Sequence, residues 1–336
     1  MKWISQPEWL FQRTMCALRS SSTPSLVIGG KPNLIPLMCI ADGLYHKTGF
    51  NFHWTFGNCR PGPGYGKIHA NQLKDKAMEI NNLERFLEKA RTAGPALGAC
   101  ITFSDPAVTE VACASGLDFV WIDGEHGEMD RNTAFLHLMA VKGTGVAAFY
   151  RVPACDHTEI KRIIDFAPAG VIVPMVMDEA DAAKAVAACR YPVHGGNRGC
   201  GYRRGWAYGA ADTDAYLEAS ARDPLVVIQL EHIDAARRLD RILEVPGVDS
   251  VMVGPYDFSM SMNKPGQFHD PEVAAALDEA CAKVKAKGLL LGAYAEGDFE
   301  DWRRRRVDYL GVRNDTNAMM DGFRRAIDSA RGGWRR

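Results

Sequence analysis

The chain has 336 residues, enough for one large domain or two ordinary ones with a sizeable core. Hydrophobic residues make up 47% and charged residues 24%, a balance typical of a soluble globular protein. The net charge of −1 gives no long-range field to attract nucleic acid, and the apolar runs fall well short of the roughly 18–20 residues that span a bilayer. We therefore predict neither a nucleic-acid nor a membrane partner.

Residues 1–77 differ from the rest, being rich in Pro, Gly, Ser and Asn and containing only three acids. Three interpretations stay open: a targeting segment, a small irregular subdomain, or a non-native extension with translation beginning at Met78. We favour the third, and treat 1–77 as an irregular N-terminal extension and 78–336 as the folded domain.

From Met78 onward the chain alternates helices and strands. An amphipathic helix is expected over 78–94. Eight short apolar runs follow, non-alternating as in a parallel sheet covered on both faces; they are 96–103, 119–123, 146–152, 170–176, 225–231, 249–255, 289–295 and 308–312. Helices are expected over 106–116, 157–167, 178–190, 233–245, 270–288 and 316–332.

Eight strand–helix units in a stretch of this length predict an α/β fold, the (β/α)₈ TIM barrel, with an extra N-terminal helix. A doubly wound open sheet is the alternative, and it favours G-x-G-x-x-G after the first strand; that pattern is absent. The nine cysteines are scattered without a C-x-x-C pair, and no signal peptide is evident. We predict reduced thiols and a cytoplasmic protein.

Polar residues end four neighbouring strands, at the face where such barrels carry their active sites. The second strand ends in Asp123-Gly-Glu-His126, the third in Arg151 and the fifth in Gln229-Leu-Glu231, and the sixth runs into Gly254-Pro-Tyr256-Asp257. Oxygen ligands without cysteine at these ends suit a divalent cation such as Mg²⁺ or Mn²⁺, so Glu231 and Asp257 are candidate ligands. The alternative is that these carboxylates form ion pairs.

The other strand-end residues suggest acid–base and enolate chemistry. Arg151 is suited to bind a carboxylate or an enolate oxygen, or else forms a structural ion pair. His126, with Asp123 three residues before it, is a candidate general base. Asp165 is a candidate to orient His126; its alternative is a surface or capping role. The Gly-rich, basic segment 194–209 is expected to form a loop over the barrel mouth.

With these positions identified, residues 95–320 resemble the HpcH/HpaI aldolase family, the metal-dependent pyruvate aldolases of the phosphoenolpyruvate/pyruvate barrel superfamily. The segments that carry the resemblance are GLDFVWIDGEHG (116–127), YRVP (150–153), EIKRIIDFAPAGVIVPMV (159–176), RYPVHGGNRGCG (190–201), VVIQLE (226–231) and GVDSVMVGPYDFS (247–259). Departures near the site, including the continuation SMSMNKPGQ after Asp257-Phe258, leave the aldehyde undetermined.

The resemblance implies a role for each candidate. Glu231 and Asp257 bind a divalent cation (Mg²⁺, Mn²⁺ or Co²⁺), and Arg151 stabilises the enolate. His126 transfers the proton, with Asp123 beside it and Asp165 in support. Further contacts to the pyruvate end of the substrate come from Gln229, Gly254 and Tyr256.

The resemblance also implies a homo-oligomer, a hexamer or trimer of dimers, in which the last helix packs on a neighbour. The expected reaction is reversible cleavage of a 4-hydroxy-2-oxo acid, of the 2-keto-3-deoxy sugar acid or hydroxyheptenedioate type, to pyruvate and an aldehyde. No lysine ends one of these strands, which disfavours a Schiff base. The alternatives are a lyase for CoA thioesters, with segment 194–209 binding the phosphates, and a non-catalytic barrel that binds a metal or an acid.

Overall fold

The protein's structure, a computed structural model, describes residues 80–92, 94–297 and 299–332. The expected extension 1–77 and the first residues of the expected helix 78–94 lie outside the described residues. No helix in the described part of the chain is long and apolar enough to cross a membrane. The cysteines of this part are free thiols.

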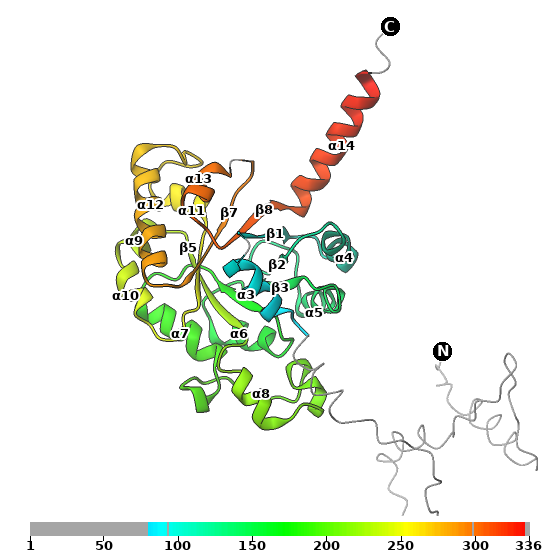
Figure 1. The fold of residues 1–336 in the computed structure, drawn as a ribbon, viewed down its shortest axis with the longest axis vertical. Helices are drawn as coiled ribbons and strands as arrows, with labels where there is room; N and C mark the ends of the chain where they lie inside the picture. Colours follow the sequence, from blue (N-terminus) through cyan, green and yellow to red (C-terminus); the bar gives the residue numbers. More distant parts are fainter. Residues whose placement is uncertain (1–79, 93, 298, 333–336) are drawn as a thin grey trace, which may run out of the picture. The chain divides into compact units, whose positions relative to one another are not determined.

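Eight parallel strands close into a barrel in chain order, with β8 pairing back onto β1 (Figure 1). This confirms the predicted fold, and each strand lies within one of the predicted runs or extends it by two residues. The strands are β1 (Ala96–Ile101), β2 (Phe119–Asp123), β3 (Ala147–Arg151), β4 (Gly170–Val173), β5 (Leu225–Leu230), β6 (Ser250–Val253), β7 (Leu290–Tyr294) and β8 (Tyr309–Asn314).

Helices surround the strands, and several begin at an aspartate whose side chain accepts a backbone N–H of the first turn, as at Asp105, Asp156 and Asp178. The expected helix 233–245 is divided at Arg238 into two short ones. The helices are α3 (Leu83–Thr92), α4 (Pro106–Ala114), α5 (Arg131–Ala140), α6 (His157–Ile164), α7 (Glu179–Cys189), α8 (Thr213–Ala219), α9 (Ile233–Arg237), α10 (Leu239–Leu243), α11 (Pro255–Ser261), α12 (Pro271–Ala286), α13 (Glu300–Arg304) and α14 (Asp315–Gly332).

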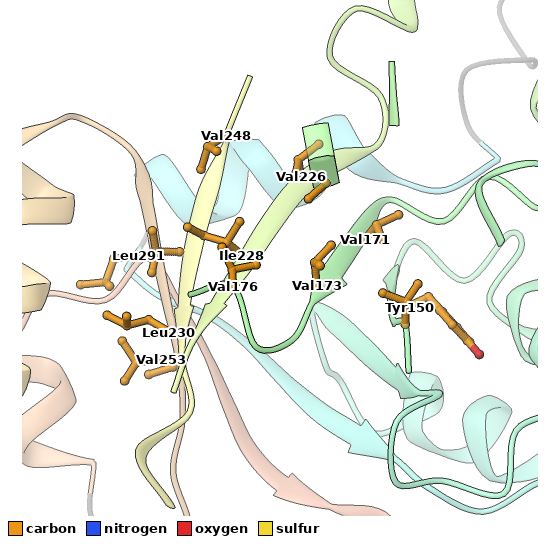
Figure 2. Close-up of a cluster of buried hydrophobic side chains, with 14 of the residues drawn as sticks. Tyr150, Val171, Val173, Val176, Val226, Ile228, Leu230, Val248, Val253 and Leu291 are labelled. Carbon is orange, nitrogen blue, oxygen red and sulfur yellow. The ribbon is translucent and has the colours of Figure 1, made fainter. Parts of the chain in front are cut away.

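Apolar side chains of the strands serve two cores. Val171 and Val173 of β4 pack outward against the surrounding helices, in the cluster shown in part in Figure 2, whereas Ile172 between them faces the barrel interior. This division explains the continuous apolar runs, since both faces of each strand are covered.

The amino-terminal end of the barrel is closed by α3. Phe86 places its ring 4.8–5.7 Å from the rings of Phe119, Phe149 and Tyr309, and all four side chains are fully buried. Gly292 is required beside them, because a Cβ there would lie 2.1 Å from the ring of Tyr309. Among the described residues, these four rings therefore close the amino-terminal end of the barrel interior.

The position expected for segment 194–209 is wrong. The segment belongs to the connection from α7 to β5, which lies at the amino-terminal ends of the strands, opposite the expected mouth. Arg204 is buried there and donates hydrogen bonds to the carbonyl oxygens of Phe166 (2.8 Å) and Leu138 (3.0 Å). Arg204 thus packs beneath the barrel and cannot reach the mouth in the same chain.

Candidate active site

Four buried polar side chains lie at the carboxyl ends of β2, β3 and β5: Asp123, Arg151, Gln229 and Glu231. Asp123 and Arg151 are paired in register on adjacent strands. Each is 6% exposed or less. The structure therefore brings these predicted residues together. Because their polar groups are buried, they need hydrogen bonds or ion pairs with one another.

Arg151 is the centre of this group. Its Nε and Nη2 donate to the two oxygens of Asp123 at 2.8 and 2.6 Å, and Nη1 lies 2.8 Å from an oxygen of Glu125 and donates to Gln229 Oε1 at 3.3 Å. The guanidinium carbon lies 4.6 Å from the ring centre of Trp121. Burial opposes the charge on Arg151, but the hydrogen bonds and charges of Asp123 and Glu125 outweigh it and raise its pKa.

The expected pairing of Asp123 with the imidazole of His126 is corrected. Besides Arg151, Asp123 accepts the backbone N–H groups of Glu125 (3.1 Å) and His126 (3.3 Å), so it orients the turn and not the ring. Burial tends to raise the pKa of Asp123, yet the Arg151 guanidinium lowers it overall. The His126 side chain is 68% exposed, and its Nε2 lies 3.7 Å from Glu125.

Within one chain, the structure does not bring Asp165 to His126. Asp165 is the carboxyl-terminal cap residue of α6, at the end of the helix farthest from the strand ends. The nearest cationic nitrogen is Nη2 of Arg198, at 4.0 Å. The capping alternative therefore describes Asp165 better, and burial raises the pKa of its carboxyl.

Glu231 is held by its neighbours. Its Oε1 accepts the backbone N–H of Met175 at 2.6 Å, and its Oε2 accepts Nε2 of Gln229. Gly254 lets β6 approach closely, because a Cβ there would lie 3.2 Å from Cβ of Glu231. Burial raises the pKa of Glu231 to about 7, and the negative charges of Glu125 and Asp257 add to this effect.

Asp257 and Tyr256 lie in the first turn of α11, directly after β6. Both are exposed, and the Tyr256 ring packs edge-on against Phe268 at 4.8 Å. Neither Glu231 nor Asp257 forms an ion pair with any described residue. The ion-pair alternative for these two carboxylates thus has no support in the described part of the chain.

The carboxylates fit a hard divalent cation. No three His, Cys, Asp or Glu side chains form a metal cage among the described residues. However, Mg²⁺ commonly binds through only one or two carboxylates and keeps water in its other positions. Burial raises the pKa of both Glu125 and Glu231, the negative charge of Asp257 adds to this effect, and a cation would offset it.

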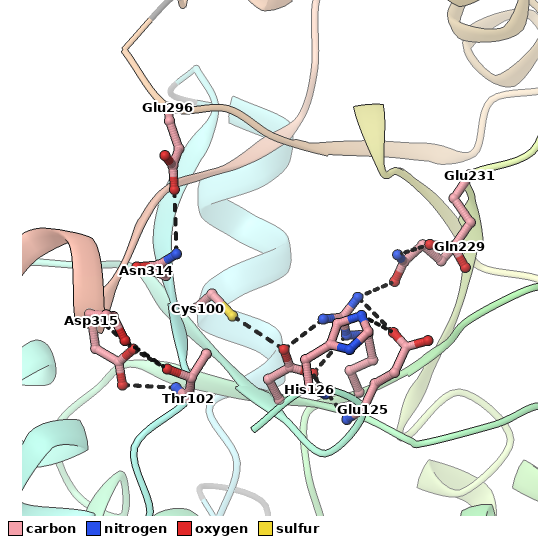
Figure 3. A network of polar contacts seen from close by, with 12 residues as sticks. Cys100, Thr102, Glu125, His126, Gln229, Glu231, Glu296, Asn314 and Asp315 are labelled. Atoms are coloured by element: carbon pink, nitrogen blue, oxygen red, sulfur yellow. Dashed lines mark hydrogen bonds and ion pairs between the residues drawn. The ribbon is translucent and has the colours of Figure 1, made fainter. Parts of the chain in front are cut away.

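Two groups of site residues were missed. Glu125 lies within the Asp-Gly-Glu-His stretch, but its ion pair with Arg151 depends on tertiary geometry. A second polar group, including Tyr294, Glu296 and Asn314, occupies the ends of β7 and β8. Figure 3 shows Glu296 and Asn314 on the side opposite Glu231. The sequence does indicate this group, because polar residues directly follow the apolar runs 289–295 and 308–312.

Several known proteins are similar to this chain. The family model described as HpcH/HpaI aldolase/citrate lyase matches residues 98–304. The chain is 35% identical over 214 residues to a 4-hydroxy-2-oxovalerate aldolase of Rhodococcus jostii, covering 63% of this chain and 81% of that protein. It is 29% identical to a 5-keto-4-deoxy-D-glucarate aldolase of Salmonella arizonae, covering 69% of this chain and 91% of that protein.

A solved structure of an HpcH/HpaI aldolase/citrate lyase family protein from Burkholderia cenocepacia has the same fold. It superposes with a TM-score of 0.67 at 25% sequence identity and covers 74% of this chain and 99% of that one.

Proposed function

Because this chain belongs to the HpcH/HpaI aldolase/citrate lyase family and is an aldolase, we propose that it cleaves a 4-hydroxy-2-oxo acid to pyruvate and an aldehyde with a divalent cation. The observation that carries this proposal is the buried Arg151, held by Asp123 beside the Gln229–Glu231 pair. The names of the relatives support the substrate class: 4-hydroxy-2-oxovalerate aldolase and 5-keto-4-deoxy-D-glucarate aldolase.

In this proposal the cation is held by Glu231 and Asp257, with Gln229 orienting the Glu231 carboxylate. When bound, the cation supplies a Lewis acid that stabilises negative charge on the keto oxygen of pyruvate. Mg²⁺, Mn²⁺ and Co²⁺ are the candidates. The pyruvate end is contacted by Gln229 and by the chain at Gly254 and Tyr256.

Arg151 supplies a fixed positive charge near the developing enolate. Its three acidic or amide partners hold the guanidinium in place, so little reorganisation accompanies the reaction. His126 is exposed at the mouth and is proposed to take the proton from the C4 hydroxyl as the C3–C4 bond breaks.

Pyruvate release from a set of 4-hydroxy-2-oxo acids tests the proposal. Activity should disappear with EDTA and return with Mg²⁺, Mn²⁺ or Co²⁺. Glu231→Gln should not recover with metal, whereas the control Asp234→Asn, on α9 with a side chain 50% exposed, should behave as wild type. Activity that resists EDTA but is abolished by borohydride with pyruvate would overturn the metal mechanism.

The alternative function, cleavage of CoA thioesters, has less support. Segment 194–209 was the candidate cationic groove, and it lies at the opposite end of the barrel from Glu231 in the same chain. We therefore expect turnover of free acids and none of the corresponding thioesters.

We also propose a homo-oligomer. Four apolar side chains of α14 are 45–62% exposed, and Asp315 is the only buried residue of this helix. The exposed four are Met319, Met320, Phe323 and Ile327. Light scattering should give a multiple of the chain mass that Phe323→Glu lowers and the control Arg325→Glu does not; a monomeric wild type would overturn this proposal.

A further inference from the structure

Five polar residues at the ends of β7 and β8 form a connected group, which we call the β7–β8 cluster. Its members are Tyr294, Glu296, Arg313, Asn314 and Asn317. Glu296 is the common acceptor: its Oε1 receives hydrogen bonds from the Tyr294 hydroxyl (2.5 Å), Asn317 Nδ2 (2.8 Å) and Asn314 Nδ2 (3.4 Å). Its Oε2 lies 3.6 Å from Nη1 of Arg313.

A β-bulge directs Asn314 toward the mouth. Gly98 of β1 pairs with Gly311, but the next residue, Ala99, pairs with Arg313, so one residue of β8 has no partner in β1. Asn314 consequently pairs with Cys100, whose side chain faces the interior. Residues in register on parallel strands point to the same face, and bulges often redirect a side chain beside an active site.

The cluster and Arg151 both contact the ring of Trp121. The Tyr294 ring contacts the ring of Trp121 edge-on at 5.8 Å, and the Arg151 guanidinium lies over that same indole. A small cavity of about 50 Å³ is lined by Tyr256, Tyr294 and Glu296, and also by the ion pair of Asp301 and Arg305. The cluster therefore borders the space that the aldehyde half of a substrate would occupy if pyruvate lies at Glu231.

The donors and acceptors of the cluster that still lack a hydrogen-bond partner are uncharged groups. Arg313 is balanced by Glu296 and by Asp321, and the oxygens of Glu296 are already engaged. The Tyr294 oxygen can still accept a hydrogen bond, and the amides of Asn314 and Asn317 each retain an N–H. Trp121 is 5% exposed, yet its Nε1–H has no partner, which is unusual for a buried donor.

We infer that the β7–β8 cluster binds hydroxyl groups on the aldehyde half of the substrate. Hydroxyls both donate and accept, and so match neutral amide, phenol and indole partners. Glu296, Asp321 and Arg313 together carry a net negative charge, which makes the region unfavourable for a distal carboxylate. A purely alkyl chain would leave the buried Nε1–H of Trp121 unpaired. This inference rests on the proposed pyruvate chemistry, and assigns selectivity for hydroxyaldehydes to this chain's own residues.

The test compares aldol addition of pyruvate to glyceraldehyde, propanal and succinic semialdehyde. Wild type should prefer glyceraldehyde. Tyr294→Phe, which keeps the ring contact with Trp121, and Asn314→Leu should each lower the glyceraldehyde-to-propanal ratio of kcat/KM by about tenfold or more. Tyr202→Phe is the control, at an exposed tyrosine beneath the barrel.

Solvent deuterium exchange into the pyruvate methyl group separates the two proposals, because it needs no aldehyde. A variant that still exchanges but keeps the wild-type ratio would overturn the cluster's role. Equal loss with both aldehydes in an exchanging variant would also overturn it. A wild type that neither exchanges nor adds pyruvate to any aldehyde would overturn the proposed function, and the inference with it.

Discussion

Arg151 is only 7% exposed in its side chain, and its planar guanidinium engages both oxygens of Asp123 at once. Lysine at this position cannot form the two parallel hydrogen bonds or lie flat on Trp121. We expect Arg151→Lys to lower kcat by about 10²–10³-fold. Steady-state pyruvate release measures this, with the exposed α6 residue Arg162→Lys as control; a loss below threefold would contradict the role of Arg151.

His126 differs from Arg151 because its side chain is largely exposed, so we expect its replacement to affect the rate and not the stability. Its imidazole is 68% exposed and lies 3.7 Å from one oxygen of Glu125, so His126→Asn should change the melting temperature little. If the imidazole transfers the hydroxyl proton, kcat for cleavage should fall by about 10²–10⁴-fold. The control His194→Asn alters a histidine bonded to the Leu217 carbonyl near the amino-terminal end of the barrel. Equal rates for His126→Asn and wild type would remove His126 from the mechanism.

At the residue scale, the sequence predicted correctly which residues lie close together at the strand ends. It predicted less well which of their side chains form hydrogen bonds with one another. Strand ends can be identified from apolar runs, and parallel strands bring their ends together, so Asp123, Arg151, Gln229 and Glu231 were found. Pairing depends on side-chain direction, so Asp123 was assigned to His126 and not to Arg151. Asp165 was misplaced because a helix of eight residues carries it away from the strand ends.

Gly254 is the place where β6 passes closest to the candidate ligands. A Cβ on this residue would lie 3.1 Å from Gln229 Nε2 and 3.3 Å from Glu231 Oε2. We expect Gly254→Ala to displace this pair and raise the Mn²⁺ concentration for half-maximal activity roughly tenfold. Gly322→Ala on α14 is a matched control, since a Cβ there meets nothing within 4 Å. Unchanged metal activation would show that the pair tolerates the extra methyl group.

At the element scale, every strand was predicted because burial on both faces makes its residues uniformly apolar. The short helices were harder. α5, α8, α11 and α13 were not predicted, since five to ten residues carry too little periodic pattern. The position of segment 194–209 was wrong although the predicted order indicated it, because a connection from helix 178–190 to strand 225–231 lies at the amino-terminal ends of the strands.

Stability of the whole molecule should depend on Asp223, which joins the start of β5 to the segment before α3. Burial raises the pKa of this carboxyl to about 6, although Asn81 Nδ2 donates to its oxygens at 2.9 and 3.0 Å. Below pH ~3 the group is largely protonated in both states, and at pH ~4 ionisation of the unfolded chain has begun. As pH rises toward 6 it ionises more readily in the unfolded chain, so the folded state loses on the order of 1–3 kcal/mol.

Urea unfolding at pH 4 and pH 6.5 measures this loss. Asp223→Asn cannot ionise and should lose less stability across that interval than wild type, while Asp212→Asn, at an exposed cap residue of α8, should follow wild type. Parallel pH profiles for wild type and Asp223→Asn would contradict the assignment.

The aromatic closure beneath the barrel also has a kinetic consequence. One end of the barrel is filled by Phe86, Phe119, Phe149 and Tyr309. Substrate and both products therefore enter and leave through the opening at the carboxyl ends of the strands. If pyruvate lies deeper, at Glu231, and the aldehyde lies nearer the outside, the products must depart in order: aldehyde first, pyruvate last. The closed end that stabilises the fold would thus also impose the sequence in which the two halves of a cleaved molecule return to solvent.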